Sequence, residues 1–337
     1  MVRYKLTRIR RNIGENKKTT RLKRKVCGKL WNLEVRKLKH VFVINPAAGP
    51  LGSENNLKLT LKEIQQRETI DIHYTSGIGD AVRFVREFCQ STDEPVRFYA
   101  CGGDGTLNEV VNGAVGFEHA AVGCYPCGSG NDFVKAFGGA ERFLDVEAQM
   151  RTEPKHIDLI RVDGKYCVNV CNFGFDAAVA STMQEVKNKF IFSGKSAYFA
   201  GVIKAFVKNV RTKCSVKVDG EELSEETILL CTIANGQYVG GSYRCAPRAL
   251  TDDGLLEICV VKPISRARFI SLIGPYSKGE HLDNSAFDDF IRYRRGKVVE
   301  VESTEPEFMY TLDGELEKQS HFKAEIVPAA IKFIVPE

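Results

Sequence analysis

The sequence predicts an α/β domain built on a parallel sheet, followed by a second, mostly antiparallel β-sandwich domain. Two observations carry this prediction. Residues 39–150 alternate short apolar runs typical of strands with amphipathic runs typical of helices, the pattern of a helix-flanked parallel sheet. Beyond residue 150 helical runs become rare, and Asp-Gly pairs, which favour hairpin turns, separate the strand-like runs.

The elements expected in the first domain follow one another with short connections. In the run 107–115, Leu107, Val110, Val111 and Ala114 are spaced i, i+3, i+4, i+7, which gives a helix one apolar face. The expected strands are 41–44, 70–74, 96–101 and 120–125, and the expected helices are 57–66, 80–89, 107–115 and 131–137.

The second domain is expected to be a sandwich with one helical insert at about 177–209. Its strands are predicted at 156–162, 166–172, 214–218, 227–234, 255–261, 297–302, 308–312 and 322–327. Asp-Gly hairpin signals lie at 163–164, 219–220, 253–254 and 313–314. The expected division is a basic extension 1–38, an α/β domain 39–150 and a β-sandwich domain 151–327, with 328–337 a candidate to return to the first domain.

Charge is unevenly distributed along the chain. Residues 1–40 carry 15 Lys and Arg against Glu15 and Glu34, a net charge of +13. The rest holds 33 basic and 41 acidic residues, a net charge of −8, so the overall +5 conceals a basic extension on an acidic body. Such an extension favours binding to an anionic membrane surface, and residues 21–36 could form an amphipathic helix on that surface. A disordered tail that keeps the protein soluble is the alternative. Nucleic acid is the less favoured partner.

Composition argues for a protein of the cytoplasm. We find no apolar run of the 18 or more residues that a membrane span needs, and no signal-peptide pattern. Eleven cysteines without a secretory signal favour a reducing compartment over disulfides. We therefore expect a cytoplasmic protein that associates peripherally with the inner face of the membrane.

The motif Cys101-Gly-Gly-Asp-Gly-Thr106 lies between a predicted strand and a predicted helix. Glycines let a backbone approach an anion closely, and the N–H groups and dipole at a helix start favour a phosphate. Asp104 in the middle of this turn indicates a Mg²⁺ ion held among phosphates. A tight turn without a ligand is the alternative.

Two further polar loops follow neighbouring predicted strands. Asn45-Pro46-Ala47-Ala48-Gly49 comes after the first strand, and Gly128-Ser129-Gly130-Asn131-Asp132 after the fourth. The carboxyl ends of parallel strands share one edge of a sheet, so these loops are expected to meet the glycine turn there. Neither a P-loop nor a Rossmann fingerprint is present.

In this order, the three motifs resemble those of the diacylglycerol kinase catalytic family, which includes bacterial lipid kinases and sphingosine kinases. The resemblance runs from about Lys39 to the C-terminus. It implies an ATP-dependent lipid kinase that phosphorylates diacylglycerol or a similar membrane alcohol with Mg²⁺, and it makes a homodimer an open expectation. An NAD kinase-type soluble kinase and a non-catalytic nucleotide- or lipid-binding regulator remain alternatives, and the lipid is not identified.

The resemblance also assigns roles to residues. Glu315 is favoured as the base, supported by Asp313, although a further Asp-Gly hairpin is the other interpretation of this segment. Asp104, Asp132 and Asp158 are mapped to a Mg²⁺ network, and Asp253 with the carbonyls of Leu250 and Leu255 to a structural metal loop. The expected nucleotide contacts are Asn45, Pro46, Ala47, Ala48, Gly49, Thr75, Gly102, Gly103, Asp104, Gly105, Thr106, Leu107, Asn108, Glu109 and Ser129. For Asn45, capping of the next turn is an equal alternative, and Gly240-Gly241 is expected to form a close-approach loop near the cleft.

Overall fold

A computed structural model describes residues 38–49, 53–174, 211–224 and 227–337. Lys39–Glu337 form one compact unit. The basic extension, apart from Leu38, and the expected helical insert lie outside the described residues.

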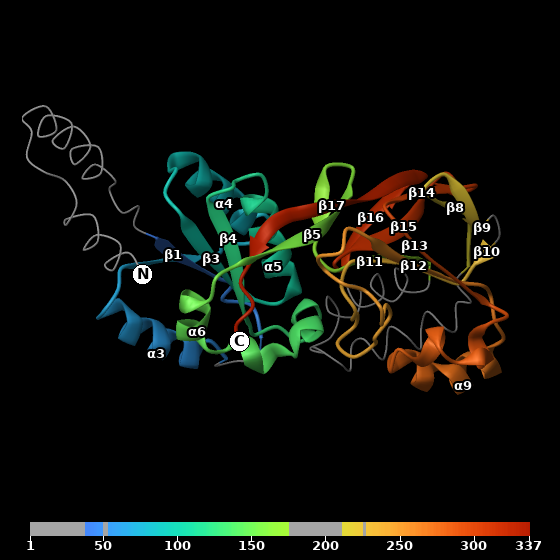
Figure 1. Cartoon of the computed structure of the whole chain (residues 1–337), viewed down its shortest axis with the longest axis horizontal. Helices are drawn as coiled ribbons and strands as arrows, with labels where there is room; N and C mark the ends of the chain where they lie inside the picture. Colours follow the sequence, from blue (N-terminus) through green and yellow to red (C-terminus); the bar gives the residue numbers. More distant parts are fainter. Residues whose placement is uncertain (1–37, 50–52, 175–210, 225–226) are drawn as a thin grey trace, which may run out of the picture. The chain divides into compact units, whose positions relative to one another are not determined.

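The first part of this unit alternates strands and helices as expected (Figure 1). Its elements are β1 (Lys39–Ile44), α3 (Ser53–Gln65), β2 (Ile70–Tyr74), α4 (Asp80–Ser91), β3 (Val96–Gly102), α5 (Asp104–Ala114), β4 (Ala120–Pro126), the 3₁₀ helices η1 (Phe133–Phe137) and η2 (Ala140–Phe143), and α6 (Val146–Arg151).

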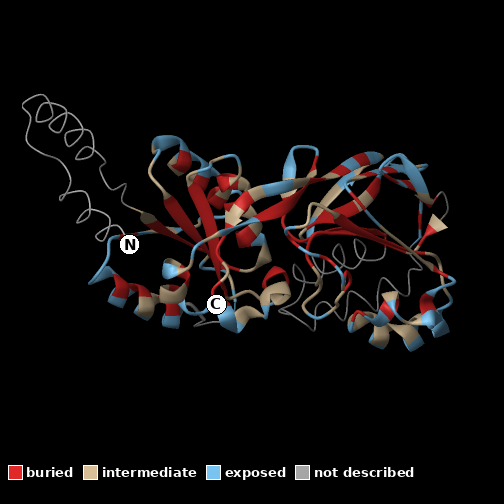
Figure 2. Ribbon diagram, in the orientation of Figure 1, coloured by how far each residue is buried: buried red, intermediate tan, exposed pale blue. Residues whose placement is uncertain are grey.

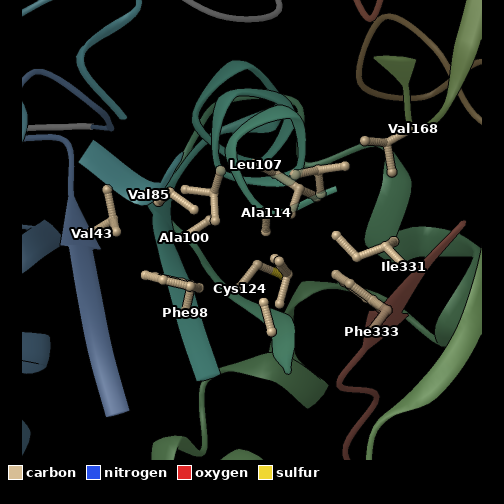
Figure 3. Close-up of a cluster of buried hydrophobic side chains, with 14 of the residues drawn as sticks. Val43, Val85, Phe98, Ala100, Leu107, Ala114, Cys124, Val168, Ile331 and Phe333 are labelled. Carbon is tan, nitrogen blue, oxygen red and sulfur yellow. The ribbon is translucent and has the colours of Figure 1, made fainter. Parts of the chain in front are cut away.

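The four strands pair in parallel in the order β4-β3-β1-β2. β3 and β4 are buried along their whole length, which explains their continuous apolar sequences (Figure 2). α4 and α5 pack against one face of the sheet, where Val85, Leu107 and Ala114 meet Phe98 and Cys124 (Figure 3). α3 and α6 cover the other face. The loops after β1, β3 and β4 therefore meet at one edge.

The second part contains most of the antiparallel strands. Its elements are β5 (Lys155–Val162), β6 (Lys165–Cys167), β7 (Val170–Gly174), β8 (Thr212–Val218), β9 (Glu221–Ser224), β10 (Thr227–Ile228), β11 (Leu230–Ala234), β12 (Leu256–Val261), α9 (Arg266–Ser277), η3 (Glu280–Leu282), η4 (Ser285–Phe287), β13 (Ile291–Gly296), β14 (Val298–Ser303), β15 (Phe308–Leu312), β16 (Glu315–Gln319) and β17 (His321–Phe333).

Two sheets form the predicted sandwich. A six-stranded antiparallel sheet has the order β13-β12-β11-β7-β15-β16. It packs on β5, β8, β14 and β17, which belong to the same eleven-stranded sheet as the parallel strands. Phe173, Ile258 and Tyr310 of the first layer share a core with Val299 and Phe322 of the second.

β17 joins the sandwich to the parallel sheet. Near its start it pairs antiparallel with β14, and at Lys332 and Phe333 it runs parallel beside β4. A register shift between Val327 and Ile331 separates these two regions. The predicted runs 322–327 and 330–335 are thus two parts of one strand. The predicted domain boundary at residue 150 stays a prediction.

Several local predictions need correction. The expected helix 131–137 is only a 3₁₀ helix, Phe133–Phe137, and it ends at Gly138, whose φ is +100°. α9 and β13 were not predicted. α9 contains the Gly274-Pro275 pair, which is typical of a turn, and half of the residues of β13 are arginines. Of the four Asp-Gly pairs, three form two-residue hairpins, but Asp253-Gly254 lies in a loop before β12. None of the helices in the described part of the chain is long and apolar enough to cross a bilayer.

Candidate functional site

The glycine turn after β3 and the loop after β4 lie in direct backbone contact. A Cβ atom on Gly128 would lie 2.4 Å from the Gly103 Cα atom, and one on Gly103 would lie 3.2 Å from the Gly128 Cα atom. The Cys127 N–H also donates to the Gly102 carbonyl at 3.0 Å. Side chains at Gly103 and Gly128 would push the two loops apart, so the sequence needs glycine at both positions.

α5 begins directly at this contact, with Asp104 as its first residue. Its first N–H groups have no acceptor within the helix, and the helix dipole adds positive potential at this end. Gly105 is exposed and leaves the helix start open. The arrangement is suited to a phosphate, as the motif predicted.

The Asp104 carboxylate faces the loop after β4. Its Oδ1 atom accepts the N–H groups of Asp132 at 2.7 Å and Phe133 at 3.3 Å. Burial and, secondly, the nearby Asp132 carboxylate raise the pKa of Asp104, while the two N–H donors oppose the rise. Its Oδ2 atom accepts no hydrogen bond from the described residues. A Mg²⁺ ion beside this oxygen would stabilise the ionised carboxylate, so Asp104 fits the predicted metal role.

The loop after β1 is tied to the same helix. Asn45 donates from its Nδ2 atom to the Thr106 Oγ1 atom at 3.1 Å, and its Oδ1 atom accepts the Ala47 N–H at 3.0 Å. Both ends of the Asn45 amide are therefore used within the protein, which is the capping interpretation of this residue. Pro46, Ala47 and Gly49 stay exposed at the edge. Thr75 lies alongside, because its N–H donates to the Ile44 carbonyl.

Asp132 connects the parallel-sheet edge to a turn of the second part. Its two carboxylate oxygens each accept the Gly241 N–H at 3.0 Å, and Oδ1 also accepts from Lys135 Nζ at 2.5 Å. Lys135 donates further to the Gly241 carbonyl at 2.7 Å. The expectation that Gly240-Gly241 forms a close-approach loop agrees with these contacts. Lys135 was missed, although its i+3 spacing from Asp132 is a known ion-pair pattern.

The mapping of Asp158 to a metal network with Asp104 and Asp132 does not agree with the structure. Its Oδ1 atom accepts the Ala329 N–H at 2.8 Å and its Oδ2 atom accepts the Gly254 N–H at 2.7 Å. Both oxygens are thus used to hold two loops. Among the described residues, no three His, Cys, Asp or Glu side chains come together as a metal site.

Asp253 also has partners other than a metal. Its Oδ1 atom accepts the Leu255 N–H at 3.1 Å, and its Oδ2 atom forms an ion pair with Arg295. The guanidinium supplies the charge that a cation would bring. The predicted metal loop of Leu250, Asp253 and Leu255 therefore does not fit these contacts.

Asp313 occupies the first position of the β15–β16 hairpin, with φ at +49°. Its Oδ1 atom accepts the N–H groups of Asn169 at 2.9 Å and Val170 at 3.1 Å. Its Oδ2 atom accepts the Val168 N–H and the Asn108 Nδ2 atom, both at 2.7 Å. A carboxylate with this many donors is a structural anchor, because it holds the β15–β16 hairpin to the segment 168–170 and to α5.

Glu315 differs sharply from Asp313, two residues before it. Its side chain is exposed and has no hydrogen-bond partner among the described residues. Its Oε1 atom lies 3.9 Å from the position of a Cβ atom on Gly105, at the open start of α5. Glu315 is thus a free carboxylate facing the predicted phosphate site. The preference for Glu315 over Asp313 as base agrees with this geometry.

Other predicted nucleotide contacts have structural roles as well. Leu107 is buried in the core, and Asn108 holds the Tyr166 carbonyl as well as Asp313. Glu109 accepts the N–H groups of Gly79 and Ala81 at the start of α4. Ser129, in contrast, is exposed on the loop after β4.

An apolar pocket lies between α9 and the six-stranded sheet. α9 packs on the face of this sheet opposite the sandwich core, because alternate strand residues point to opposite faces. All the described lining residues are apolar or aromatic: Leu229, Leu230, Val239, Tyr243, Val261, Ile264, Phe269, Leu272, Ile273, Tyr276, Phe287, Phe290 and Ile291. The sequence analysis did not predict this pocket, because its walls come from segments that are distant in the chain.

One turn connects the pocket to the polar site. Val239 and Tyr243 pair with each other through two backbone hydrogen bonds, and both side chains line the pocket. Gly241, at the tip of this turn, is the residue that bonds Asp132 and Lys135. The apolar pocket and the glycine-rich edge are therefore neighbours.

His281 is a buried histidine beside this pocket. It is 2% exposed, its ring lies 4.5 Å from that of Tyr276, and burial lowers its pKa to about 4. The pKa of a histidine in an unfolded chain is near 6.5. Between about pH 6.5 and pH 4, His281 is therefore protonated in the unfolded state and neutral in the folded state. Stability should fall as the pH drops from about 6.5 to about 4, by roughly 3 kcal/mol in total.

The His281→Phe variant tests this pH dependence, because phenylalanine cannot be protonated. Urea unfolding at pH 7, 5.5 and 4.5 should give a shallower loss of stability in this variant than in the wild type. His156→Phe, which changes an exposed histidine, is the control. Equal pH slopes in the wild type and His281→Phe would contradict the prediction.

Comparison with known proteins identifies the family of this chain. Residues 39–162 match the family model of the diacylglycerol kinase catalytic domain, and residues 169–335 match that of the YegS C-terminal NAD kinase beta sandwich-like domain. A curated relative from Chromohalobacter salexigens, described as "Probable lipid kinase YegS-like", is 31% identical over 77% of this chain and 81% of its own. A protein from Bacillus subtilis described as "Diacylglycerol kinase" is 29% identical over 81% of this chain and 88% of its own.

A solved structure shares the fold. The crystal structure of a diacylglycerol kinase from Bacillus anthracis superposes with a TM-score of 0.65 at 22% identity, covering 88% of this chain and 96% of that one. The sequence relatives are named as kinases of lipids, and the matched segments contain both the glycine-rich edge and Glu315. The chain belongs to the diacylglycerol kinase catalytic family, and it is a lipid kinase of this family.

Proposed function

We propose that this protein transfers the γ-phosphate of ATP to the hydroxyl group of a membrane lipid, and that diacylglycerol is its substrate and phosphatidate its product. One observation carries the proposal. The turn from Val239 to Tyr243 lines an apolar pocket and, through Gly241, contacts Asp132 beside the glycine-rich edge. An amphiphile could therefore keep its acyl part in the pocket while its hydroxyl lies near the phosphates.

The polar residues would divide the work of phosphoryl transfer. The start of α5 and the Gly103–Gly128 contact would hold the nucleotide phosphates. Mg²⁺, held by the Asp104 carboxylate and the phosphates, would neutralise charge that develops during transfer. Glu315 would take the proton of the lipid hydroxyl. The hydroxyl oxygen would attack the γ-phosphorus, and the bond between the γ-phosphorus and the leaving ADP would break.

The pocket also supports a lipid over NAD as the acceptor. The lining residues that the structure describes are all apolar or aromatic, and such residues offer few partners for the hydroxyl, amide and phosphate groups of a dinucleotide. Acyl chains need no such partners and gain free energy from burial. A purely regulatory role is less well supported, because Glu315 remains free at the open start of α5.

The test is ATP- and Mg²⁺-dependent phosphate transfer to lipid in mixed micelles, with NAD assayed in parallel. Wild-type protein should label diacylglycerol and leave NAD unlabelled. Label in NAD alone would contradict the proposal. Label in sphingosine or ceramide alone would support the lipid kinase activity but contradict diacylglycerol as the substrate.

A pair of variants on α9 tests the pocket. Leu272 lines the pocket, so Leu272→Glu should raise the KM for the lipid by about tenfold or more, because a charge would have to be buried against acyl chains. The KM for ATP should stay unchanged. Ile270→Glu is the matched control, since Ile270 is 64% exposed on the same helix. Equal effects of the two variants on lipid KM would argue against the pocket.

We also propose that residues 1–38 attract the protein to anionic membranes. The support is their charge, because most of the +13 of residues 1–40 lies there. Each basic residue near an anionic surface contributes on the order of 1 kcal/mol at most. A chain beginning at Lys39 should therefore bind phosphatidylserine vesicles more weakly than the full chain, and added salt should remove the difference.

A further inference from the structure

Two polar residues lie side by side on the face of the six-stranded sheet that borders the apolar pocket. Thr232 of β11 is the register partner of Asn172 of β7. Their chain neighbours Cys231 and Phe173 belong to the sandwich core, so Thr232 and Asn172 point to the opposite face. That face is the one on which α9 packs.

Thr232 is surrounded by residues of the pocket wall. On the same face of β11 it lies between Leu230, which lines the pocket, and Ala234. Leu230 and Ala234 belong to two different apolar clusters, and the pocket residue Tyr276 of α9 packs against both. Val239, another pocket residue, packs against the second cluster. Thr232 and Asn172 therefore form a polar pair in the sheet wall of an otherwise apolar pocket.

The polar pair is buried and has two unused hydrogen-bonding atoms. Thr232 is 0% exposed and Asn172 is 2% exposed. Within the described part of the chain, neither Thr232 Oγ1 nor Asn172 Oδ1 has a hydrogen-bond partner. Buried polar atoms in folded proteins almost always have one. Two such atoms side by side in the wall of a pocket point to a ligand group that satisfies them.

The strand order places the polar pair between the pocket and Glu315. β7 and β11 are followed in the sheet by β15 and β16 on the side of β7, and Glu315 is the first residue of β16. Adjacent strands are separated by about 4.8 Å, so β7 lies about 10 Å from β16. A diacylglycerol with its hydroxyl group near Glu315 would thus pass the polar pair before its acyl chains reach Leu230.

We propose that Thr232 and Asn172 bind an ester carbonyl oxygen of the acceptor lipid and make this enzyme select ester-linked over ether-linked chains. The proposal rests on the proposed function. The Thr232 hydroxyl can donate to one lone pair of the carbonyl oxygen. The Asn172 amide, turned by half a rotation, can donate from Nδ2 to the other lone pair. The apolar lining beyond the polar pair would hold the hydrocarbon chain.

The experiment compares dioctanoylglycerol with the dioctyl ether of glycerol, in which CH₂ groups replace both carbonyls. The reacting hydroxyl is the same in the two lipids. In mixed micelles the wild type should have a kcat/KM about three- to tenfold higher for the ester, the range of one hydrogen bond between neutral groups. Thr232→Val should reduce this ratio to about one without changing kcat/KM for the ether. Asn172→Leu, which removes the second donor, should lower the ratio in the same direction.

The stability of Thr232→Val separates lipid binding from a structural role. Valine keeps the branched shape of threonine and lacks the hydroxyl, so the midpoint of urea unfolding should be unchanged or higher. A hydroxyl that bonds Asn172 or a trapped water molecule would instead stabilise the folded protein. A lower midpoint for Thr232→Val would therefore overturn the proposal.

The control is Thr212→Val, which changes a buried threonine of β8 in the other sheet. It should keep the wild-type ratio of ester to ether. Equal ratios in the wild type and Thr232→Val would overturn the carbonyl subsite while leaving the kinase proposal intact, and equal losses with both lipids would overturn it too. A wild-type protein that phosphorylates neither lipid would overturn both proposals.

Discussion

Replacing Glu315 by glutamine is expected to lower the rate of lipid phosphorylation by about 10²- to 10⁴-fold, the range typical of a lost general base. Glutamine has nearly the same shape but cannot take a proton. Glu315 is exposed and has no hydrogen-bond partner among the described residues, so its replacement should leave stability within about 0.5 kcal/mol of the wild type. The measurement is kcat in mixed micelles together with urea unfolding of the same preparation.

The control for this variant is Glu317→Gln on the same strand. Glu317 lies two residues further along β16, on the same face, and pairs with Lys165. Its replacement removes the same charge but leaves the Glu315 carboxylate beside Gly105 in place, so kcat should change little. If Glu315→Gln kept a normal rate, the assignment of Glu315 as the base would be wrong.

The ATP affinity of Glu315→Gln gives a second check. Glu315 faces the phosphate site but would act on the lipid hydroxyl, so ATP binding should not weaken. Removal of a negative charge near a triphosphate should leave it the same or slightly stronger. A large loss of ATP affinity would show that the residue acts in nucleotide binding, and the base would then have to be sought elsewhere.

The sequence predicted the architecture well where local patterns decide it. The alternation of strands and helices from β1 to α5 could be predicted for two reasons. The apolar residues of each segment recur with the period of a strand or of a helix, and glycine or polar residues mark where each segment ends. The glycine turn at Gly102-Gly103 was recognised for the same reason. α9 was missed although Phe269, Leu272, Ile273 and Tyr276 are spaced i, i+3, i+4, i+7, because the Gly274-Pro275 pair within it is typical of a turn.

The roles of individual acids were much harder to predict. Asp104, Asp132, Asp158 and Asp313 all follow or lie within apolar strands, so the sequence gives them similar surroundings. What separates them is whether both oxygens of a carboxylate accept hydrogen bonds: among the described residues Asp104 uses only Oδ1, whereas Asp158 uses both oxygens. The donors come from loops such as those of Gly241 and Ala329, which are more than 80 residues away from Asp132 and Asp158 in the chain. Tertiary contacts, and not local motifs, decide which carboxylate stays free.

Asp313 provides the second large expected effect, which concerns stability. Asp313→Asn should lower the free energy of unfolding by about 3 to 5 kcal/mol, the range for breaking a hydrogen-bonded carboxylate network. Asparagine also tolerates the positive φ of this position, so backbone strain would not explain the loss. The amide can accept at one atom only, and its NH₂ group would face N–H donors of Val168, Asn169 or Val170. Urea unfolding measures the change.

The Asp163→Asn variant is the control, because it measures how much stability an Asp-Gly hairpin loses when its aspartate is replaced without breaking such an anchor. Asp163 has the same hairpin position and nearly the same φ, +48°, but among the described residues its carboxylate accepts a hydrogen bond only from the Gln319 side chain. Its replacement should cost no more than about 0.5 kcal/mol. Equal stability of the two variants would contradict the anchoring role. The β15–β16 turn that Asp313 anchors also places Glu315 near Gly105. If Asp313→Asn is much less stable and also has a lower kcat, the loss of activity therefore follows from a displaced hairpin.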